Sequence, residues 1–415
     1  MKYAIIGGSF NPFHNGHLQL ARSVQKLGFD RVIFVPAFQS PFKQSGQSGN
    51  ATERLSMLLA AVCADVSLTV DPCELKREGV SYTIDTVRDI LERYTTDEKP
   101  ALVIGDDLVP EFHLWRGAQE ISENCNIIIA SRIYSGNQPF PYPYTMLGND
   151  VLPVSSHEIR DLIAKNGAWQ NLVPKAVKDI IEDQGFYNLR GGARSYPNPP
   201  PLAPASSAQS ACGVFRYPPA GHKDAAFAIE TQVRALLKPY RFVHSRNVAL
   251  HCYDLCKRFG IDPYRGYIAG ICHDVCKEHA DIKKLAKKDK LPFSALEQKK
   301  PSLLHGRAGA IFIQENLGIE DSEIIEAVRF HTTGTAGMCT LAKIVYLCDK
   351  IEAGRNTVDT KLRRLAFCKE GENLTADELF NIILNATCKY LVDSGLDLAD
   401  ETIKLASNYK GSSGA

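Results

Sequence analysis

The chain has 415 residues, which is more than one ordinary domain holds and suits two or three domains. Hydrophobic residues make up 44% of it and charged residues 23%, the fractions of a soluble globular protein. The formal net charge is +1, so the overall charge gives no reason to expect a nucleic acid or a membrane surface as a partner.

The N-terminus and the cysteines indicate the compartment. Met1–Ile5 leads directly into a predicted strand without the apolar core of a signal peptide, and no apolar run is long enough to span a bilayer. The 12 cysteines include no Cys-x-x-Cys pair, so we expect reduced, mostly buried thiols in a cytoplasmic protein. Cys252/Cys256 and Cys272/Cys276 are each four residues apart, and a zinc site on one helix face is the alternative.

From residue 1 to about 189, short apolar runs alternate with amphipathic stretches. This alternation predicts an α/β domain with a doubly wound parallel sheet and helices on both faces. The expected strands are Lys2–Ile6, Arg31–Pro36, Ser67–Val70, Ala101–Ile104, Asn126–Ala130 and Asp150–Pro153. The expected helices are His17–Lys26, Thr52–Cys63, Thr83–Tyr94, Ala118–Glu123, Glu158–Lys165 and Pro174–Asp183.

A change of composition then divides the chain. Residues 190–222 are rich in proline, serine and glycine and show no hydrophobic period, which predicts a flexible, disordered linker. From residue 223 to 415, apolar residues recur at spacings of three and four, as in Ile313 and Leu317, which predicts an all-α domain. We therefore expect domains at residues 1–189 and 223–415.

The most informative segment follows the first strand. Gly7–His17 reads Gly-Gly-Ser-Phe-Asn-Pro-Phe-His-Asn-Gly-His. A glycine turn between a strand and a helix start directs backbone amides and the positive end of the helix dipole at a bound anion. Gly7 and Gly8 would let a phosphate approach the backbone closely, and His14 and His17 would add imidazole N–H donors. The alternative is an ordinary turn with capping histidines.

This segment resembles the signature of the nucleotidyltransferase superfamily, Gly-Gly-[Ser/Thr]-Phe-Asp-Pro-x-His-x-Gly-His. The resemblance implies a Rossmann-like fold that transfers a nucleotidyl group from ATP or CTP to a phosphate or similar acceptor and releases pyrophosphate. Asn11 stands where the family usually has aspartate, and because it carries no charge we assign it no catalytic role. The ATP-binding residues implied here are Gly7, Gly8, Ser9 and Phe10.

A second segment, Ser155–Arg160, opens a predicted helix and reads Ser-Ser-His-Glu-Ile-Arg. Ser155 and Glu158 fit a capping box, which is a purely structural interpretation. The segment is also similar to the family's Ser-Ser-Thr-x-x-Arg, which binds the ATP phosphates. The residues this similarity assigns to ATP are Ser155, Ser156 and Arg160, while His157 replaces the threonine and receives no role.

Two further segments resemble the nicotinate-mononucleotide adenylyltransferases of this superfamily. Arg77–Thr86 carries their Ser-Tyr-Thr-x-Asp-Thr pattern, and Ile104–Asp107 matches their Gly-Ala-Asp segment with Asp106 in place of alanine. The acceptor-binding residues this implies are Ser81, Tyr82, Thr83, Asp107, Trp115 and Arg132. An alternative for Thr83 is a helix cap. Trp115 could stack on the pyridine ring of the acceptor, and the alternative is a core tryptophan.

Pro41-Phe42-Lys43 resembles the subfamily's Pro-His-Lys, whose lysine meets substrate phosphates, although Phe42 replaces the histidine. The resemblance covers residues 1 to about 189 and ends at Gln184–Tyr187. It implies transfer of AMP from ATP to nicotinate mononucleotide in NAD biosynthesis. Nicotinamide mononucleotide and a pantetheine phosphate are alternative acceptors.

This chemistry needs no nucleophile from the protein. An oxygen of the acceptor's 5′-phosphate attacks the α-phosphorus of ATP in line, so the protein must position the substrates and stabilise negative charge. Mg²⁺ would bridge the phosphates. The residues assigned to catalysis are His14, His17, Lys43 and Arg160, supported by Ser156.

The helical half carries charged residues inside apolar helices. His273-Asp274 ends the apolar stretch from Tyr267, where a charge is costly unless a metal ion or a similar partner compensates it. His244 and Asp349 lie in similar apolar surroundings. The order His, His-Asp, Asp resembles the ligand signature of HD-domain phosphohydrolases. Each histidine could instead be an ordinary core or surface residue.

The closest resemblance is to HD proteins that hydrolyse diadenosine tetraphosphate symmetrically to two ADP. It rests on His273–Lys277, Leu303–Gly306, His331–Gly334 and Asp349–Glu352. It implies one or two transition metals, such as iron or manganese, that lower the pKa of an attacking water. The implied ligands are His244, His273, Asp274, His305, His331 and Asp349, with Asp274 between two ions and with Lys277 and Arg355 as candidates for substrate phosphates.

The sequence therefore predicts a bifunctional enzyme whose partners are small molecules, namely ATP, nicotinate mononucleotide and a dinucleoside polyphosphate. A non-catalytic nucleotide sensor, or a hydrolase of guanosine tetraphosphate or a cyclic dinucleotide, is the alternative for the helical half. Metal identity, coupling between the two activities and the oligomeric state, a homo-oligomer included, stay open.

Overall fold

The computed structural model describes residues 1–39, 50–63, 65–131, 139–150, 152–187, 223–355 and 359–410. They belong to two compact units, Met1–Tyr196 and Pro197–Ala415. The expected linker at 190–222 lies outside the described residues, as do Lys43 and Arg132. In the described ranges, every helix is too short or too polar to cross a membrane.

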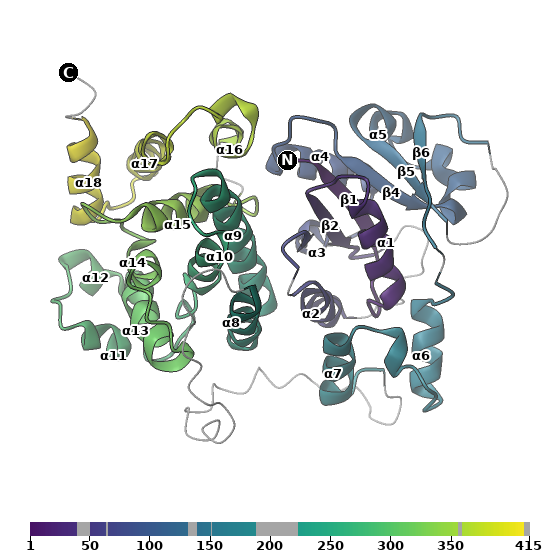
Figure 1. Cartoon of the computed structure of the whole chain (residues 1–415), viewed down its shortest axis with the longest axis horizontal. Helices are drawn as coiled ribbons and strands as arrows, with labels where there is room; N and C mark the ends of the chain where they lie inside the picture. Colours follow the sequence, from purple (N-terminus) through teal and green to yellow (C-terminus); the bar gives the residue numbers. More distant parts are fainter. Residues whose placement is uncertain are drawn as a thin grey trace. The chain divides into compact units, whose positions relative to one another are not determined.

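The N-terminal unit contains one sheet of six parallel strands in the order β3-β2-β1-β4-β5-β6 (Figure 1). The strands are β1 (Tyr3–Gly8), β2 (Arg31–Pro36), β3 (Leu68–Val70), β4 (Ala101–Gly105), β5 (Asn126–Ala130) and β6 (Tyr144–Leu147). β1 is central and pairs with both β2 and β4. Because the strand order reverses between β1 and β4, their carboxyl ends leave a crevice in which such sheets bind ligands.

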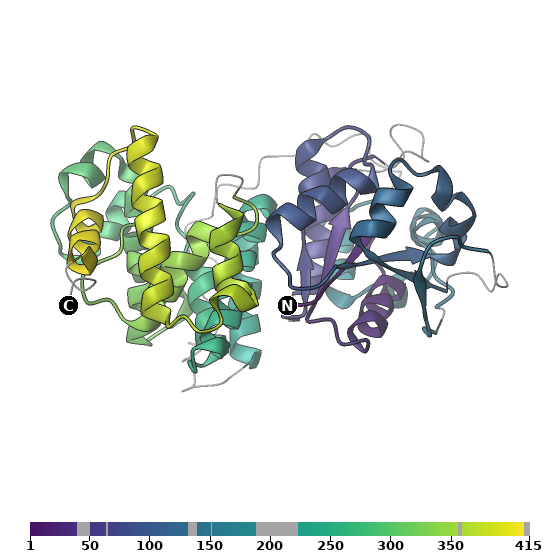
Figure 2. The same ribbon diagram turned by 90° about the horizontal axis from the view of Figure 1, so that it is seen from above.

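Helices cover both faces of this sheet, and Figure 2 shows α1 on one face and α4 and α5 on the other. The helices are α1 (Asn15–Gln25), α2 (Ala51–Val62), α3 (Cys73–Arg77), α4 (Thr83–Arg93), α5 (Ala118–Asn124), α6 (Ser156–Ala164) and α7 (Lys175–Gln184). Two 3-10 helices are η1 (Asp106–Leu114) and η2 (Gln170–Leu172). The predicted α/β class and doubly wound parallel sheet are confirmed.

The last expected strand was placed wrongly. Asp150–Pro153 does not form a strand in its described residues, and the sixth strand is β6, whose first three residues are exposed. β6 lies at the sheet edge, so it lacks the continuous apolar run that marks a buried strand. Leu152 and Pro153 line a cavity instead, and Pro153 has no backbone N–H to pair with a neighbouring strand.

A separate apolar cluster anchors α6 and α7 to α2. It contains Met57 of α2, Ile159 and Ile163 of α6, and Val177 and Ile181 of α7, all buried. This packing fixes the orientation of α6, whose first turn carries the predicted ATP segment. The cluster therefore links the hydrophobic core to the position of Ser156 and Arg160.

The C-terminal unit is entirely helical in its described residues, as predicted. Its α-helices are α8 (Lys223–Leu236), α9 (Pro239–Arg258), α10 (Pro263–Cys272), α11 (Ile282–Ala286), α12 (Ala295–Lys299), α13 (His305–Leu317), α14 (Ser322–Phe330), α15 (Thr340–Ile351), α16 (Thr360–Phe367), α17 (Ala376–Asp393) and α18 (Asp400–Lys410). The 3-10 helices are η3 (Lys287–Asp289), η4 (Pro301–Leu304) and η5 (Lys369–Gly371).

The contact between α9 and α10 is unusually close. A Cβ atom at Gly270 of α10 would lie 2.6 Å from the Cα of Ala249 on α9, so only glycine allows this approach. His244 lies on α9 and His273 directly follows α10. The backbone contact at Gly270 thus brings two predicted metal ligands together.

Candidate functional sites

The N-terminal unit has a cavity of about 1280 Å³ lined by the ends of β1 and β4 and by the start of α6. All of the described N-terminal residues predicted to bind or react with substrate line it. They are Gly7, Gly8, Ser9, Phe10, His14, His17, Ser81, Tyr82, Thr83, Asp107, Trp115, Ser155, Ser156 and Arg160. The fold therefore brings together segments that lie far apart in the sequence.

The two histidines of the glycine turn form a rigid pair. The rings of His14 and His17 stack with centroids 3.6 Å apart, and the backbone N–H of His14 donates to Nδ1 of His17 over 3.2 Å. Phe10 and Phe13 pack against His17 with ring centroids 5.0 and 5.1 Å away. Because Nδ1 of His17 accepts a hydrogen bond, its neutral ring carries the proton on Nε2, on the side of the ring away from this backbone contact.

The predicted ATP segment is tied to the same loop. Ser156 Oγ donates to the carbonyl of Pro12 over 2.9 Å, and Arg160 donates to the carbonyl of Asn11 over 2.7 Å. Ser155 accepts the Glu158 backbone N–H and caps α6. The amino end of α6 and the glycine turn thus form one continuous rim, where amides and a guanidinium could hold phosphates.

Asn11 acts as a packing residue in this structure. Its side chain is 6% exposed, and its Oδ1 accepts a hydrogen bond of 2.7 Å from the hydroxyl of Tyr187. This contact joins the glycine turn to the end of α7.

The predicted acceptor segment lines another part of the cavity. Ser81 Oγ accepts the Phe38 backbone N–H over 3.0 Å, and α4 begins at Thr83 with Tyr82 at the N-cap position. The alternative of Thr83 as the helix cap is therefore wrong. Trp115 is half-buried, packs on Phe112 with ring centroids 4.9 Å apart and lines the cavity.

Sequence reasoning missed a cation beside this segment. The guanidinium of Arg116 lies 5.0 Å from the centre of the Tyr82 ring and 3.6 Å from Asp85, and Arg116 lines the cavity. Its position directly after Trp115 was the available signal. Arg116 adds positive charge where the predicted acceptor residues gather.

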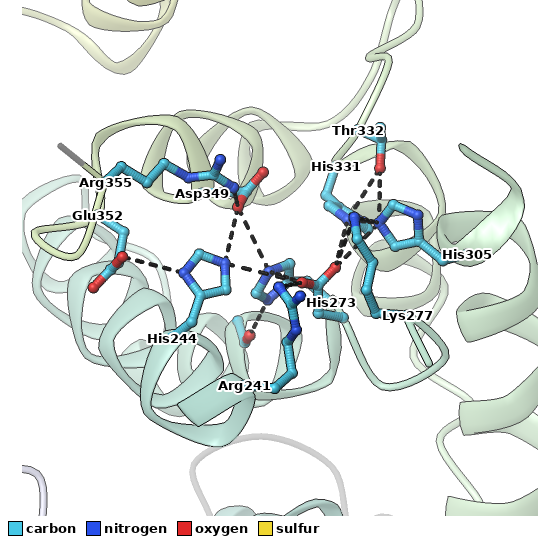
Figure 3. Close-up of polar contacts among 12 residues, drawn as sticks. Arg241, His244, His273, Lys277, His305, His331, Thr332, Asp349, Glu352 and Arg355 are labelled. Atoms are coloured by element: carbon cyan, nitrogen blue, oxygen red, sulfur yellow. Dashed lines mark hydrogen bonds and ion pairs between the residues drawn. The ribbon is translucent and has the colours of Figure 1, made fainter. Parts of the chain in front are cut away.

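In the C-terminal unit, the six predicted metal ligands converge from five helices or helix ends (Figure 3). Their ligand atoms form two groups, one of His244, His273 and Asp274 and one of Asp274, His305 and His331, each within 4.8 Å. Asp349 joins the first group, with Oδ1 lying 3.2 Å from His244 Nε2 and 3.7 Å from His273 Nε2. Asp274 belongs to both groups.

The imidazole orientations suit metal binding. Nδ1 of His273, His305 and His331 lies 2.7, 2.6 and 2.7 Å from a backbone carbonyl of Gly270, Ser302 and Val328. These contacts place a proton on each Nδ1 and leave Nε2 as a ligand atom.

The Nε2 atoms of these three rings face one another and the carboxylate of Asp274. Nε2 of His305 and His331 lie 2.9 Å apart, and Nε2 of His273 is buried without a hydrogen bond to any described residue. Facing imidazole nitrogens and buried carboxylates form a donor set that fits zinc, iron or manganese.

Burial and charge define the protonation of this cluster. Burial lowers the pKa of His273 to about 3, which keeps its ring neutral. Burial alone would raise the pKa of Asp274 and Asp349. Contacts with the imidazoles of the cluster and with Lys277 instead hold the pKa of Asp274 well below its usual range, and Lys350 and Arg355 do the same for Asp349. His244 differs, because Asp349 and Glu352 outweigh its burial and raise its pKa to about 9. A metal ion would therefore find a neutral ring at His273 and ionised carboxylates, and it would displace a proton from His244.

Cations surround the two carboxylates. Lys277 Nζ lies 3.1 Å from His305 Nε2 and 3.7 Å from Asp274, and Arg355 donates to Asp349, so both predicted phosphate candidates are at the site. Arg241 and Lys350, which were not predicted, lie 3.2 Å from Asp274 and 2.9 Å from Asp349. Arg241 precedes His244 by one helical turn, a spacing that could have pointed to it.

Two other histidines of this unit pack against aromatic rings. His251 stacks on Phe367 with ring centroids 4.5 Å apart, and His279 lies beside Phe312. Cysteines in the described part of the chain are free thiols, and neither metal-compatible group there includes one.

Comparisons with known proteins match each of the two units to a family. A cytidylyltransferase-like family model matches residues 5–162, and an HD domain model matches residues 241–354. A protein of Treponema pallidum named as a probable nicotinate-nucleotide adenylyltransferase is 37% identical over 45% of this chain and 99% of its own length. One with the same name from Borreliella afzelii is 34% identical over 45% of this chain and 97% of its own length.

Among solved structures, a Clostridium acetobutylicum protein described as a "predicted HD superfamily hydrolase involved in NAD metabolism" is 28% identical to this chain. The match covers 43% of this chain and 94% of that chain, with a TM-score of 0.39. The two curated relatives are matched over nearly their whole length. The chain therefore belongs, through its N-terminal unit, to the nicotinate-nucleotide adenylyltransferase family, and its C-terminal unit carries an HD domain.

Proposed function

We propose that the N-terminal unit transfers AMP from ATP to nicotinate mononucleotide, forming nicotinate adenine dinucleotide and pyrophosphate. The observation that carries this proposal is the cavity shared by the glycine turn, the start of α6 and the acceptor segment. An acceptor phosphate oxygen forms the new bond to the α-phosphorus while the bond to pyrophosphate breaks. His17 and Arg160 supply donors for the charge on the phosphate oxygens, and Mg²⁺ enters with ATP.

A panel of acceptors tests this assignment. Nicotinate mononucleotide, nicotinamide mononucleotide and a pantetheine phosphate are each incubated with ATP, and pyrophosphate release is measured. We expect the highest kcat/KM with nicotinate mononucleotide. A higher value with either other acceptor would contradict the proposed acceptor, and no turnover with any of them would contradict nucleotidyl transfer to these phosphates.

Trp115 provides a sharper test of the acceptor position. We expect Trp115→Ala to raise the KM for nicotinate mononucleotide about tenfold, because it removes an aromatic surface from the cavity, while the KM for ATP stays unchanged. Steady-state kinetics of both substrates measures this. Trp115→Phe keeps an aromatic ring and is the matched control. Equal increases in both KM values would argue against stacking on the acceptor.

We propose that the HD unit hydrolyses diadenosine tetraphosphate symmetrically: water adds to a phosphorus, one bridging P–O bond breaks, and two ADP form. Four cations around the carboxylates, namely Arg241, Lys277, Lys350 and Arg355, support a polyanionic substrate. The six ligands described above would hold one or two ions, which would polarise phosphate oxygens and lower the pKa of water. The protein's cations bind and orient the phosphate chain.

Product analysis distinguishes the alternatives for this unit. The full chain is incubated with Mn²⁺ or Fe²⁺ and with diadenosine tetraphosphate, guanosine tetraphosphate or a cyclic dinucleotide, and products are separated by chromatography. We expect ADP alone from diadenosine tetraphosphate. Formation of AMP and ATP would contradict symmetrical cleavage, and faster turnover of another nucleotide would contradict the substrate. Absence of bound metal and of turnover would favour a nucleotide sensor.

A further inference from the structure

Glu352, directly after α15, directs its carboxylate at His244 (Figure 3). Its Oε2 lies 3.2 Å from His244 Nδ1, and its Oε1 accepts a hydrogen bond of 2.9 Å from the side chain of Asn247. Asn247 follows His244 on α9 and is itself buried. Glu352 is 2% exposed, so its charge is held inside the protein by these partners.

This arrangement makes His244 different from the other three histidines of the cluster. His273, His305 and His331 each direct Nδ1 at a neutral backbone carbonyl, whereas His244 directs Nδ1 at a carboxylate. A hydrogen bond to an ionised acceptor is stronger than one to a carbonyl. A carboxylate on the far nitrogen of an imidazole also fixes the ring orientation and makes the ligand atom more basic.

The turn after α15 is shaped around this carboxylate. A Cβ atom at Gly354 would lie 2.8 Å from Oε2 and 3.0 Å from Oε1 of Glu352, so a larger residue would displace the side chain. Arg363 of α16 is buried and donates to the carbonyls of Ile351, Glu352 and Arg355 over 3.0, 3.1 and 2.6 Å. The backbone on both sides of the carboxylate is therefore fixed.

We propose that Glu352 is a positioning residue for the metal centre: it holds His244 with the proton on Nδ1 and makes it the strongest imidazole ligand of the cluster. Glu352 acts only through His244. The proposal rests on metal binding at this cluster and needs no particular nucleotide as substrate.

The test measures metal binding by the full chain. Glu352→Gln keeps the size of the side chain and an oxygen that can accept from His244, but it removes the negative charge. We expect its dissociation constant for Mn²⁺ to be about 10–100 times that of the unchanged protein. The measurement is competition with a fluorescent chelator. Glu326→Gln removes a carboxylate of α14 that accepts the Cys339 backbone N–H outside the cluster, and we expect no change.

Two further variants separate the positioning role of Glu352 from the premise that Mn²⁺ binds at this cluster. His273→Ala removes a ligand and tests whether Mn²⁺ binds at this cluster at all. Asn247→Ala leaves Glu352 charged but releases its Oε1, so we expect a smaller rise in the dissociation constant than for Glu352→Gln. If His273→Ala weakens Mn²⁺ binding while Glu352→Gln and Asn247→Ala bind it as tightly as the unchanged protein, the positioning role is overturned.

The absorption spectrum of the Co²⁺-loaded protein is a second readout, since it reports the ligand field of the bound ion. We expect Glu352→Gln to shift the visible bands and Glu326→Gln to leave them in place. If Glu352 had a purely structural role, the bands would stay in place in Glu352→Gln as well as in Glu326→Gln. Nucleotide hydrolysis enters neither measurement, so failure of the proposed substrate would leave this result intact.

Discussion

Replacing His17 by alanine is expected to lower the kcat of adenylyl transfer by about 10²–10³, the usual cost of losing one donor to a transition state. His17 lines the cavity, and its ring is fixed by Phe10, Phe13 and the backbone N–H of His14. The KM for ATP should change little, because the donor is needed most when charge develops on the phosphate oxygens. Pyrophosphate release under saturating substrates measures the effect.

Two comparisons make this result interpretable. His113→Ala removes an exposed histidine of the same unit that lies outside the cavity lining, and its kcat should equal that of the unchanged chain. Nucleotide hydrolysis by the HD unit should also be unchanged in His17→Ala. Near-normal adenylyl transfer by the variant would remove His17 from the catalytic machinery.

The second large effect concerns Asp274, which lies in both groups of metal-compatible residues. Its carboxylate oxygens lie 3.7 Å from His273 Nε2, 3.1 Å from His305 Nε2 and 3.6 Å from His331 Nε2. Asp274→Asn removes the charge shared by the two groups, so we expect metal content to fall and hydrolysis to drop by at least about 10². Elemental analysis and chromatographic detection of ADP measure the two effects.

The control for this prediction is Asp281→Asn, which changes an exposed aspartate of the same unit. Its metal content and hydrolysis should match those of the unchanged protein. Adenylyl transfer should survive in both variants. An Asp274→Asn protein that retained two ions and normal hydrolysis would show that Asp274 is no shared ligand.

The α/β architecture could be predicted because its signals are local. Buried parallel strands form continuous apolar runs, and β1, β2, β4 and β5 all have this form. β6 could not be found this way, because at the sheet edge three of its four residues face solvent. The strand was predicted at 150–153 instead because this stretch is apolar, but its described residues line the cavity.

In the candidate sites, too, residues with a local sequence signal could be predicted, whereas residues brought in by folding could not. His273 and Asp274 stood out because an aspartate beside a histidine at the end of an apolar helix costs free energy unless a partner compensates the buried charge. Arg241 and Glu352 did not, since a cation and a carboxylate near helix ends are ordinary until folding brings them to Asp274 and His244. Glu352 does follow Asp349 by three residues, so helical spacing from a predicted ligand was the signal that remained unused.

The approach of α9 to α10 has a consequence for how this protein can change over evolution. A Cβ atom at Gly270 would meet the backbone of Ala249, and one at Gly266, a helical turn earlier, would lie 2.8 Å from the carbonyl oxygen of Cys252, so the separation of these helices depends on two glycines. A side chain at either glycine would push the helices apart and alter the spacing between His244 and His273. The candidate metal centre can thus be lost through a change at a glycine that has no side chain to bind a metal.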